Sequence, residues 1–356
     1  MLRRLAISVS AAALLCLAPA TVAFAQAKYS FKMTTWFPEG STAWDVFAKS
    51  FAEKVKTLTD GQVEIKLYAP GVLGGVFDGE KTVQDGLADM AHAWPGFIVN
   101  QDPANAFFGS LPGGMAPETL LAWVYSGGGR ELWVKFREER MGLYPIVAGV
   151  LGTEVFAHSH RPLRTVDDFK GLKHRTAGAF AQILPKLGAS AAVVPGPEVF
   201  TMLERKGIDS TEYLTPAENF KLGFHKVAKY VITPGVHTPA AIYSVSVKKT
   251  IWDKLPDEIK AKMELAGHAV TLESYTMTAK LDTEAMKQLR DSNVEIVQLA
   301  PETIAKIREL GREWAQQQAA EQKAKGNPWM ERIAESYFAF QDTWANNASH
   351  RMYDGN

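Results

Sequence analysis

The sequence predicts an α/β fold made of two lobes joined by a hinge. Short apolar strands alternate with amphipathic helices along most of the chain, which is typical of α/β proteins. Two strands, expected at 143–151 and 229–232, would carry the chain from one lobe to the other and back, so that the lobes can rotate around a ligand. A helix from Pro256 to about Asn293 contains no strong breaker and would be ~50 Å long, which exceeds one lobe.

The first 25 residues have the pattern of a secretory signal peptide. A positively charged start precedes an apolar run from Leu5 to Ala18, and Ala23-Phe24-Ala25 is a small-x-small cleavage site. We therefore expect export to the periplasm. The single cysteine, Cys16, lies inside this segment, so the mature chain is expected to form no disulfide.

The rest of the chain, about 330 residues, has the length of roughly two domains. The full chain carries 39 basic and 39 acidic side chains, and removal of Arg3 and Arg4 leaves 37 against 39, a net charge of −2. Because there is no basic stripe, we expect no nucleic-acid partner. No later run of about 18 apolar residues occurs, so no membrane-spanning helix is expected in the mature chain.

The amino-terminal part has the order β-α-β-α-β. We expect these strands and helices in turn at 29–35, 44–58, 63–68, 80–87 and 89–91. In a parallel sheet built this way, the carboxyl ends of the strands meet at one edge, where ligands bind. Trp36 and Trp94 each follow a strand and are candidates to line a cleft there, with packing under a loop as the alternative.

Two helices, expected at 117–125 and 130–141, lead to the strand 143–151. Between them lie three consecutive glycines, Gly127 to Gly129. No Gly-Lys-Ser/Thr follows these glycines and no strand precedes them, which excludes a phosphate-binding loop. We expect a flexible break between the two helices.

The segment from Thr165 to Asp209 repeats the alternation of strand and helix. Strands are expected at 172–175 and 191–194, and a helix at 198–204. Arg175 ends the first of these strands and faces a helix start, a position where α/β folds bind ligands. Its guanidinium is suited to bidentate binding of a carboxylate.

Two helical faces are predicted near the carboxyl terminus. On the long helix, the buried side is expected at Met263, Ala266, Val270, Met277 and Leu281. On the last helix, an aromatic-rich face is expected at Trp329, Ile333, Tyr337, Phe340 and Trp344. This face is expected either to pack on the chain's own body or to form the interface of a homodimer, and we favour the dimer.

Three runs of sequence point to one family. They are D-D-F-K-G-L-K-x-R, P-x-E-V-F-x-M-L-E-x-x-G-I-D and I-D-S-T-E-Y-L-T-P-A-E-N-F-K-L-G-F. Together they resemble the solute receptors of tripartite ATP-independent periplasmic (TRAP) transporters, over nearly the whole mature chain. The best match is the branch that binds 2-oxo and 2-hydroxy monocarboxylates. The resemblance implies a two-lobed periplasmic-binding-protein-like fold with a helix across both lobes and carboxyl-terminal helices that some members exchange in a dimer.

This resemblance also gives expected domain boundaries. One lobe is expected to comprise residues 26–148 with about 236–256, and the other 149–235 with about 290–310. The helix 257–293 is expected to span both lobes, and 311–356 to form the carboxyl-terminal helices.

The resemblance implies a ligand site at four positions. Arg175 matches the carboxylate-binding arginine of the family. Glu212 matches a cation ligand. Tyr213 matches the residue whose backbone carbonyl also binds the cation and whose ring closes the pocket, although the relatives have tryptophan there. Glu154, aligned through L-R-T-V-D-D-F, falls where the relatives have a glutamine that binds both cation and ligand.

The glutamate at position 154 changes the expected cation. Two carboxylates beside an anionic ligand repel each other unless a cation neutralises them. This arrangement favours a hard divalent ion with oxygen ligands, and we expect Ca²⁺, with Na⁺ as the alternative.

Other positions are weaker candidates. Phe180 follows the turn after Arg175 and Asn219 lies near a helix start, so both are candidate pocket contacts, with a helix-start surface role as the alternative for Asn219. The remaining candidates are histidines: the pair His158 and His160, and the isolated His225 and His237. None of these histidines has the spacing of a metal site, so none is expected to bind a cation.

The motifs for catalysis are missing from the sequence. It contains no G-x-S-x-G elbow and no H-E-x-x-H, and Arg175 would keep a pair of glutamates ionised rather than leave one as a proton donor. We therefore expect a receptor without enzyme activity that delivers a small organic acid to membrane permease subunits. The alternatives are a receptor of the same fold for a dicarboxylate or sugar acid, and one that supplies a sensor.

Overall fold

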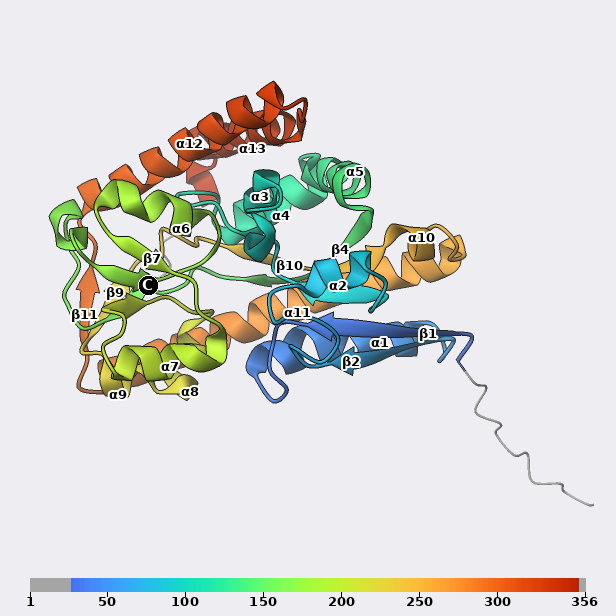
Figure 1. Cartoon of the computed structure of the whole chain (residues 1–356), viewed down its shortest axis with the longest axis horizontal. Helices are drawn as coiled ribbons and strands as arrows, with labels where there is room; N and C mark the ends of the chain where they lie inside the picture. The colour runs from blue at the N-terminus through green and yellow to red at the C-terminus, as the bar shows by residue number, and fades with distance from the viewer. Residues whose placement is uncertain (1–26, 352–356) are drawn as a thin grey trace, which may run out of the picture.

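The computed structural model describes residues 27–351 and has the predicted two-lobed α/β architecture (Figure 1). One lobe is built on a five-stranded sheet with the strand order β2-β1-β3-β10-β4, and the other on a six-stranded sheet with the order β11-β9-β5-β8-β6-β7. The predicted signal peptide lies outside the described residues. Within residues 27–351, no helix is both long enough and apolar enough to cross a membrane.

The first sheet combines parallel and antiparallel strands. β1 (Tyr29–Thr35) pairs in parallel with β2 (Val63–Tyr68) and β3 (Met90–Ala93). β10 (Ala241–Lys248) runs antiparallel to β3 and to β4 (Leu143–Leu151). The predicted bounds of β1, β2 and β4 are confirmed. The first helix begins as one π-helical turn at Trp44–Lys49 and continues as α1 (Ser50–Leu58), and α2 is Gly79–Gln84.

The second sheet has shorter strands. They are β5 (Ala157–Ser159), β6 (Lys173–Arg175), β7 (Ser190–Ala192), β8 (Ser210–Thr211), β9 (Tyr230–Thr233) and β11 (Glu295–Gln298). The helices α6 (Gly178–Ile183), α7 (Gly196–Glu204), α8 (Pro216–Leu222) and α9 (Phe224–Val227) accompany them. β6 pairs in parallel with β7 and β8, so the carboxyl ends of these three strands meet at one edge.

The two connections between the lobes lie against each other. The first follows β4 and contains Glu154, and the second leads from β9 to β10. The backbone N–H of Glu154 donates to the carbonyl oxygen of Thr238 at 3.3 Å, and Thr153 Oγ1 donates to the Pro239 carbonyl oxygen at 2.9 Å. A Cβ on Gly235 would overlap the Glu154 carbonyl oxygen, so only glycine allows this close approach. Glu154 therefore sits at the hinge.

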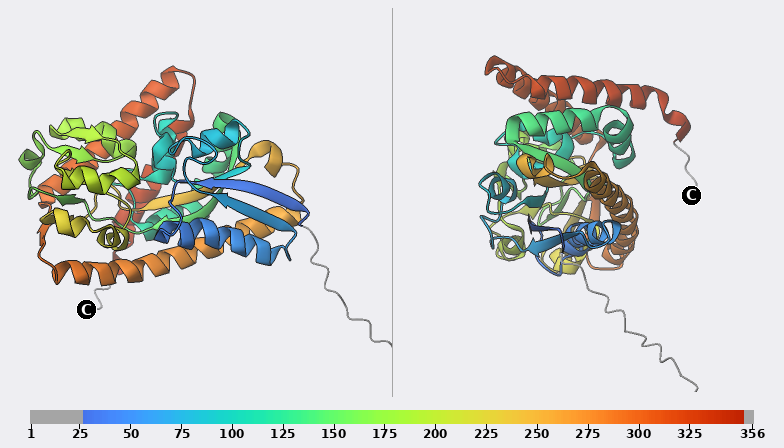
Figure 2. Two further views of the ribbon diagram at one scale, coloured as in Figure 1. Left: turned by 60° about the horizontal axis from the view of Figure 1, so that its bottom comes forward. Right: turned by 90° about the vertical axis from the view of Figure 1, so that its right-hand side faces the viewer.

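The long helix α11 (Asp257–Arg290) runs along both lobes, as Figure 1 and the left view of Figure 2 show in orange. It contacts α1 and β4 in the first lobe and α8 in the second. Met263, Ala266 and Val270 are buried as predicted, but Met277 is 47% exposed and its assignment to the buried side was wrong. Leu281 is only partly buried.

Hydroxyl side chains take the place of apolar ones in the middle of α11. Thr271 Oγ1 accepts from the backbone N–H of Gly149 at 3.2 Å, and Ser274 Oγ accepts from that of Val150 at 3.4 Å. β4 is the edge strand of its sheet, so its outward N–H groups need acceptors from another element. This requirement explains why the apolar stripe is interrupted at the hinge.

The carboxyl-terminal helices α12 (Pro301–Ala324) and α13 (Trp329–Asn347) form a pair that lies over the body of the molecule (Figure 1). α13 packs on α3 (Ala106–Gly109), α4 (Pro117–Ser126) and α5 (Gly129–Met141). Trp329, Ile333 and Tyr337 are buried there, and the Tyr337 hydroxyl accepts from the backbone N–H of Met115 at 2.7 Å. Most of the aromatic face therefore packs on the chain's own body. Phe340 and Trp344 remain partly exposed.

The break between α4 and α5 is as predicted. α4 ends at Ser126, Gly128 has a φ of 85°, and α5 starts at Gly129. A positive φ is readily adopted by glycine, which allows the chain to turn sharply between the two helices.

Candidate functional site

A cavity of about 390 Å³ lies between the lobes. The first lobe contributes aromatic walls that include Trp36, Trp94 and Phe97, and the second lobe contributes Arg175 and Tyr213. Glu154 from the hinge and Glu212 from the second lobe complete the polar part of the lining. A cavity of this size with mostly apolar walls and a few convergent polar groups is typical of small-molecule sites.

Arg175 is fixed by its neighbours at the carboxyl end of β6. Its Nη1 donates to the backbone carbonyl of Glu212 at 2.9 Å and lies 3.3 Å from Glu212 Oε1, while Nε and Nη2 donate to the Val194 carbonyl oxygen at 3.2 and 3.0 Å. The Tyr213 ring lies 5.3 Å from the guanidinium carbon. Of the five guanidinium N–H groups, one on Nη2 makes no hydrogen bond to the described residues and can donate to a ligand.

Glu212 directly follows the last residue of β8, Thr211. Its Oε1 accepts from the backbone N–H of Ala177 at 3.2 Å, just before α6, as well as from Arg175. Burial raises the pKa of Glu212, and the nearby positive charge of Arg175 opposes this shift.

Glu154 faces the same cavity. Its pKa is raised well above the usual value, first by burial and then by the negative charge of Glu212. Its Oε2 is buried and has no hydrogen-bond partner among the described residues. Two buried carboxyl groups thus share a site in which Arg175 is the neighbouring positive charge, and a bound cation would remove their repulsion.

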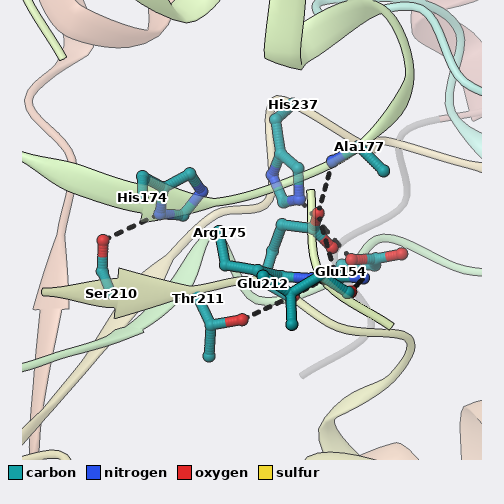
Figure 3. Close-up of polar contacts among 9 residues, drawn as sticks. Glu154, His174, Arg175, Ala177, Ser210, Thr211, Glu212 and His237 are labelled. Atoms are coloured by element: carbon teal, nitrogen blue, oxygen red, sulfur yellow. Dashed lines mark hydrogen bonds and ion pairs between the residues drawn. The ribbon is translucent and has the colours of Figure 1, made fainter. Parts of the chain in front are cut away.

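His237 also belongs to this cluster, contrary to the prediction that it is isolated. Its Nε2 lies 3.5 Å from Glu154 Oε2 (Figure 3). Three ligand atoms, one from each of Glu154, Glu212 and His237, all lie within 4.8 Å of one another. This spacing suits a single metal ion. The return connection from β9 to β10 brings His237 to Glu154, and no local spacing in the sequence reveals this contact.

The two predicted tryptophans both line the cavity. Each also packs edge-on against Phe97, with ring centroids 4.7 Å (Trp36) and 5.0 Å (Trp94) away. Both alternatives considered for these tryptophans therefore apply, because each ring lines the cavity and also packs against a neighbouring side chain. Tyr213 lines the opposite wall, and burial raises its pKa to about 12, so its hydroxyl stays neutral.

Two other predicted pocket residues do not reach the cavity. Phe180 is 2% exposed and packs on Phe156, His174 and His237 behind the site, because α6 turns its ring into the core. Asn219 is fully buried in α8, where Thr215 caps the helix by accepting from the Glu218 backbone N–H. Asn219 therefore holds neither the pocket position nor the surface position considered for it.

Comparison with known proteins gives one family. A sequence model for the bacterial extracellular solute-binding proteins, family 7, matches residues 34–322. Among named proteins, the chain is similar to the monocarboxylate 2-oxoacid-binding periplasmic protein of Nostoc sp., with 28% identity over 276 residues that cover 76% of this chain and 74% of that protein.

Solved structures of TRAP periplasmic solute-binding proteins also resemble the fold. The protein from Pseudoalteromonas atlantica, with bound sodium and pyruvate, superposes with a TM-score of 0.82 at 26% identity, covering 92% of this chain and 99% of that one. The protein from Colwellia psychrerythraea, with bound calcium and pyruvate, gives 0.84 at 25% identity, covering 91% and 98%.

Proposed function

Since this chain belongs to the bacterial extracellular solute-binding proteins of family 7, the receptors of TRAP transporters, we propose that its cavity binds a small 2-oxo or 2-hydroxy monocarboxylate together with a cation. One observation carries the proposal: Arg175 and the carboxyl groups of Glu154 and Glu212 meet in a single buried cavity with aromatic walls. A guanidinium recognises the carboxylate, and a cation between the two glutamates recognises an oxygen beside it.

The expected roles follow from the contacts. The free N–H of Arg175 binds one carboxylate oxygen of the ligand. Glu154, Glu212 and the backbone carbonyl of Tyr213 hold the cation, which chelates the second carboxylate oxygen and the 2-oxo or 2-hydroxy oxygen. Two carboxylates favour Ca²⁺ over Na⁺, and the pyruvate complexes of the two structural relatives, one with each ion, support a cation in this role.

The aromatic walls favour a short apolar end on the ligand. Trp36, Trp94 and Phe97 face the charged groups across the cavity and enclose space for a methyl group or a small branched chain. Closure of the lobes about the hinge at Glu154 buries ligand and cation together. TRAP receptors work with membrane permease components, and we propose that this chain delivers its ligand in that way, without catalysis, after export by its first 25 residues.

A homodimer through the carboxyl-terminal helix is a separate part of the proposal. Phe340 and Trp344 stack at a centroid distance of 6.1 Å near the end of α13 and are only partly covered by their own chain. Light scattering on the purified mature protein measures the mass directly. A monomer at micromolar concentration would contradict the dimer and leave the ligand proposal unaffected.

Calorimetric titration tests the ligand. The mature protein is titrated with pyruvate, lactate, 2-oxobutyrate and 2-oxoisovalerate before and after treatment with a chelator of divalent ions. We expect binding that is lost on chelation and restored by Ca²⁺. Binding that is indifferent to the chelator would indicate Na⁺ or no cation. If no monocarboxylate binds, the proposal fails and the alternatives, dicarboxylates and sugar acids, are titrated next.

A further inference from the structure

We propose that His237 supplies a nitrogen ligand to the cation site, so that the site binds a divalent transition-metal ion such as Zn²⁺ or Co²⁺ more tightly than Ca²⁺. This inference deepens the proposed function, because it rests on a cation held by Glu154 and Glu212. Imidazole is a preferred ligand of Zn²⁺ and Co²⁺, whereas Ca²⁺ and Na⁺ prefer oxygen.

The contact between His237 and Glu154 is unusual for a protein interior. His237 is 2% exposed and Glu154 is 9% exposed. Neither ring nitrogen of His237 has a hydrogen-bond partner among the described residues, and neither has Glu154 Oε2. Buried polar atoms are nearly always paired, so His237 Nε2 and Glu154 Oε2, which lie 3.5 Å apart, indicate a missing group between them.

The distance between the two groups indicates what is missing. In a neutral imidazole, one ring nitrogen carries a lone pair. A lone pair that faces a carboxylate oxygen is repelled unless a proton or a metal ion lies between them. The separation of 3.5 Å is too long for a good hydrogen bond. Two ligand atoms of a tetrahedral metal ion lie about 3.4 Å apart when each is about 2.1 Å from the metal. The separation of His237 Nε2 and Glu154 Oε2 matches this distance.

Neighbouring side chains hold the ring in place. Phe156 packs edge-on against the His237 ring at 5.1 Å, and Phe180 lies at 5.5 Å. Such an apolar shell orients a ligand and excludes water from a metal site. Glu154 and His237 lie on the two connections between the lobes, and Glu212 lies in the second lobe, so one ion would join the hinge to that lobe.

Metal titration of the purified, metal-stripped mature protein is the first test. Zn²⁺ and Ca²⁺ are titrated in the absence of organic acid, with a competing fluorescent chelator for Zn²⁺. We expect tighter binding of Zn²⁺. His237→Asn should weaken Zn²⁺ binding by about 100-fold, as expected for loss of a metal ligand, and change Ca²⁺ binding much less. The matched control is His158→Asn, since His158 is fully buried, has no hydrogen-bond partner within residues 27–351, and packs on Phe224 away from the cavity.

NMR of histidine side chains distinguishes a metal ligand from a residue that only supports the structure. In protein labelled with ¹⁵N-histidine, Zn²⁺ should shift one ring nitrogen from the position of a free lone pair to that of a metal-bound nitrogen, and this signal should be missing from His237→Asn. Zn²⁺ binding that is no tighter than Ca²⁺ binding, or a His237 signal that stays unshifted when Zn²⁺ is bound, would overturn the inference.

Pyruvate titration of the same samples separates the two proposals. If pyruvate binds with Ca²⁺ but the His237 signal does not respond to Zn²⁺, only the nitrogen ligand is wrong. If Zn²⁺ binds with the expected shift while no monocarboxylate binds with any cation, the metal site stands and the proposed ligand fails.

Discussion

At the scale of single residues, the charge of Glu154 is expected to affect the choice between Ca²⁺ and Na⁺. Glu154→Gln removes one negative charge with little change in shape. We expect Ca²⁺ affinity to fall at least tenfold, because unit charges ~4 Å apart interact by about 4 kcal/mol even at an effective dielectric constant of 20. We also expect Na⁺ to support pyruvate binding in this variant. Calorimetry with each ion measures both effects.

The control for this variant is Glu218→Gln. Glu218 is buried on α8, and its Oε2 has no hydrogen-bond partner in the described part of the chain, but it does not line the cavity. An equal loss of Ca²⁺ affinity in the two variants would mean that Glu154 acts through the stability of the fold.

Substitution of Arg175 tests whether a positive charge alone is enough for ligand binding. Arg175→Lys keeps the positive charge but cannot hold the Val194 carbonyl, the Glu212 side chain and a ligand at once. We expect the affinity for pyruvate to fall by about 10- to 100-fold, which corresponds to one charge-assisted hydrogen bond of about 1.5–3 kcal/mol. Ca²⁺ binding without pyruvate should change little. Arg161→Lys, outside the cavity, should bind pyruvate as the unmodified protein does.

At the scale of elements, the hydroxyl groups of α11 stabilise the edge of β4. Thr271→Val leaves the Gly149 N–H buried without an acceptor, and Ser274→Ala does the same to the Val150 N–H. We expect each variant to lower the free energy of unfolding by about 1–3 kcal/mol. Denaturant unfolding measures this loss. Thr276→Val is the control, because its exposed hydroxyl bonds only within its own helix, and a loss as large in this control would refute the role of the β4 contacts.

Helices and strands could be predicted from the sequence where a single local pattern defines them. β1, β2 and β4 follow from their apolar runs, and α11 follows from the lack of a breaker. Met277 was placed on the buried side because an apolar stripe was assumed to continue, whereas Ser274 and Thr278 hold the buried positions of this stretch. The strand-end position indicated Arg175, and the family resemblance led to Glu154 and Glu212. His237 reaches these residues only through the fold of the second connection between the lobes.

At the scale of the whole molecule, buried neutral histidines link stability to pH. His92 lies in the core of the first lobe and His158 in the second, and both are fully buried. Burial lowers the pKa of His92 from 6.5 to about 4 and that of His158 to about 3. The unfolded chain therefore binds protons below pH 6.5 that the folded chain does not. The stabilising contribution is complete above pH 6.5 and is lost as the pH falls towards 4 and 3.

We accordingly expect the free energy of unfolding to fall on acidification from pH 7.5 to 4.5, by up to about 1.4 kcal/mol per pH unit for each such histidine. The raised pKa values of Glu154 and Glu212 act in the opposite direction, since their protonated forms are favoured in the folded state. Denaturant unfolding at several pH values measures the slope. His158→Asn should reduce the slope because it removes one of the protonation sites, and a slope that is unchanged in this variant would show that other groups control the acid lability.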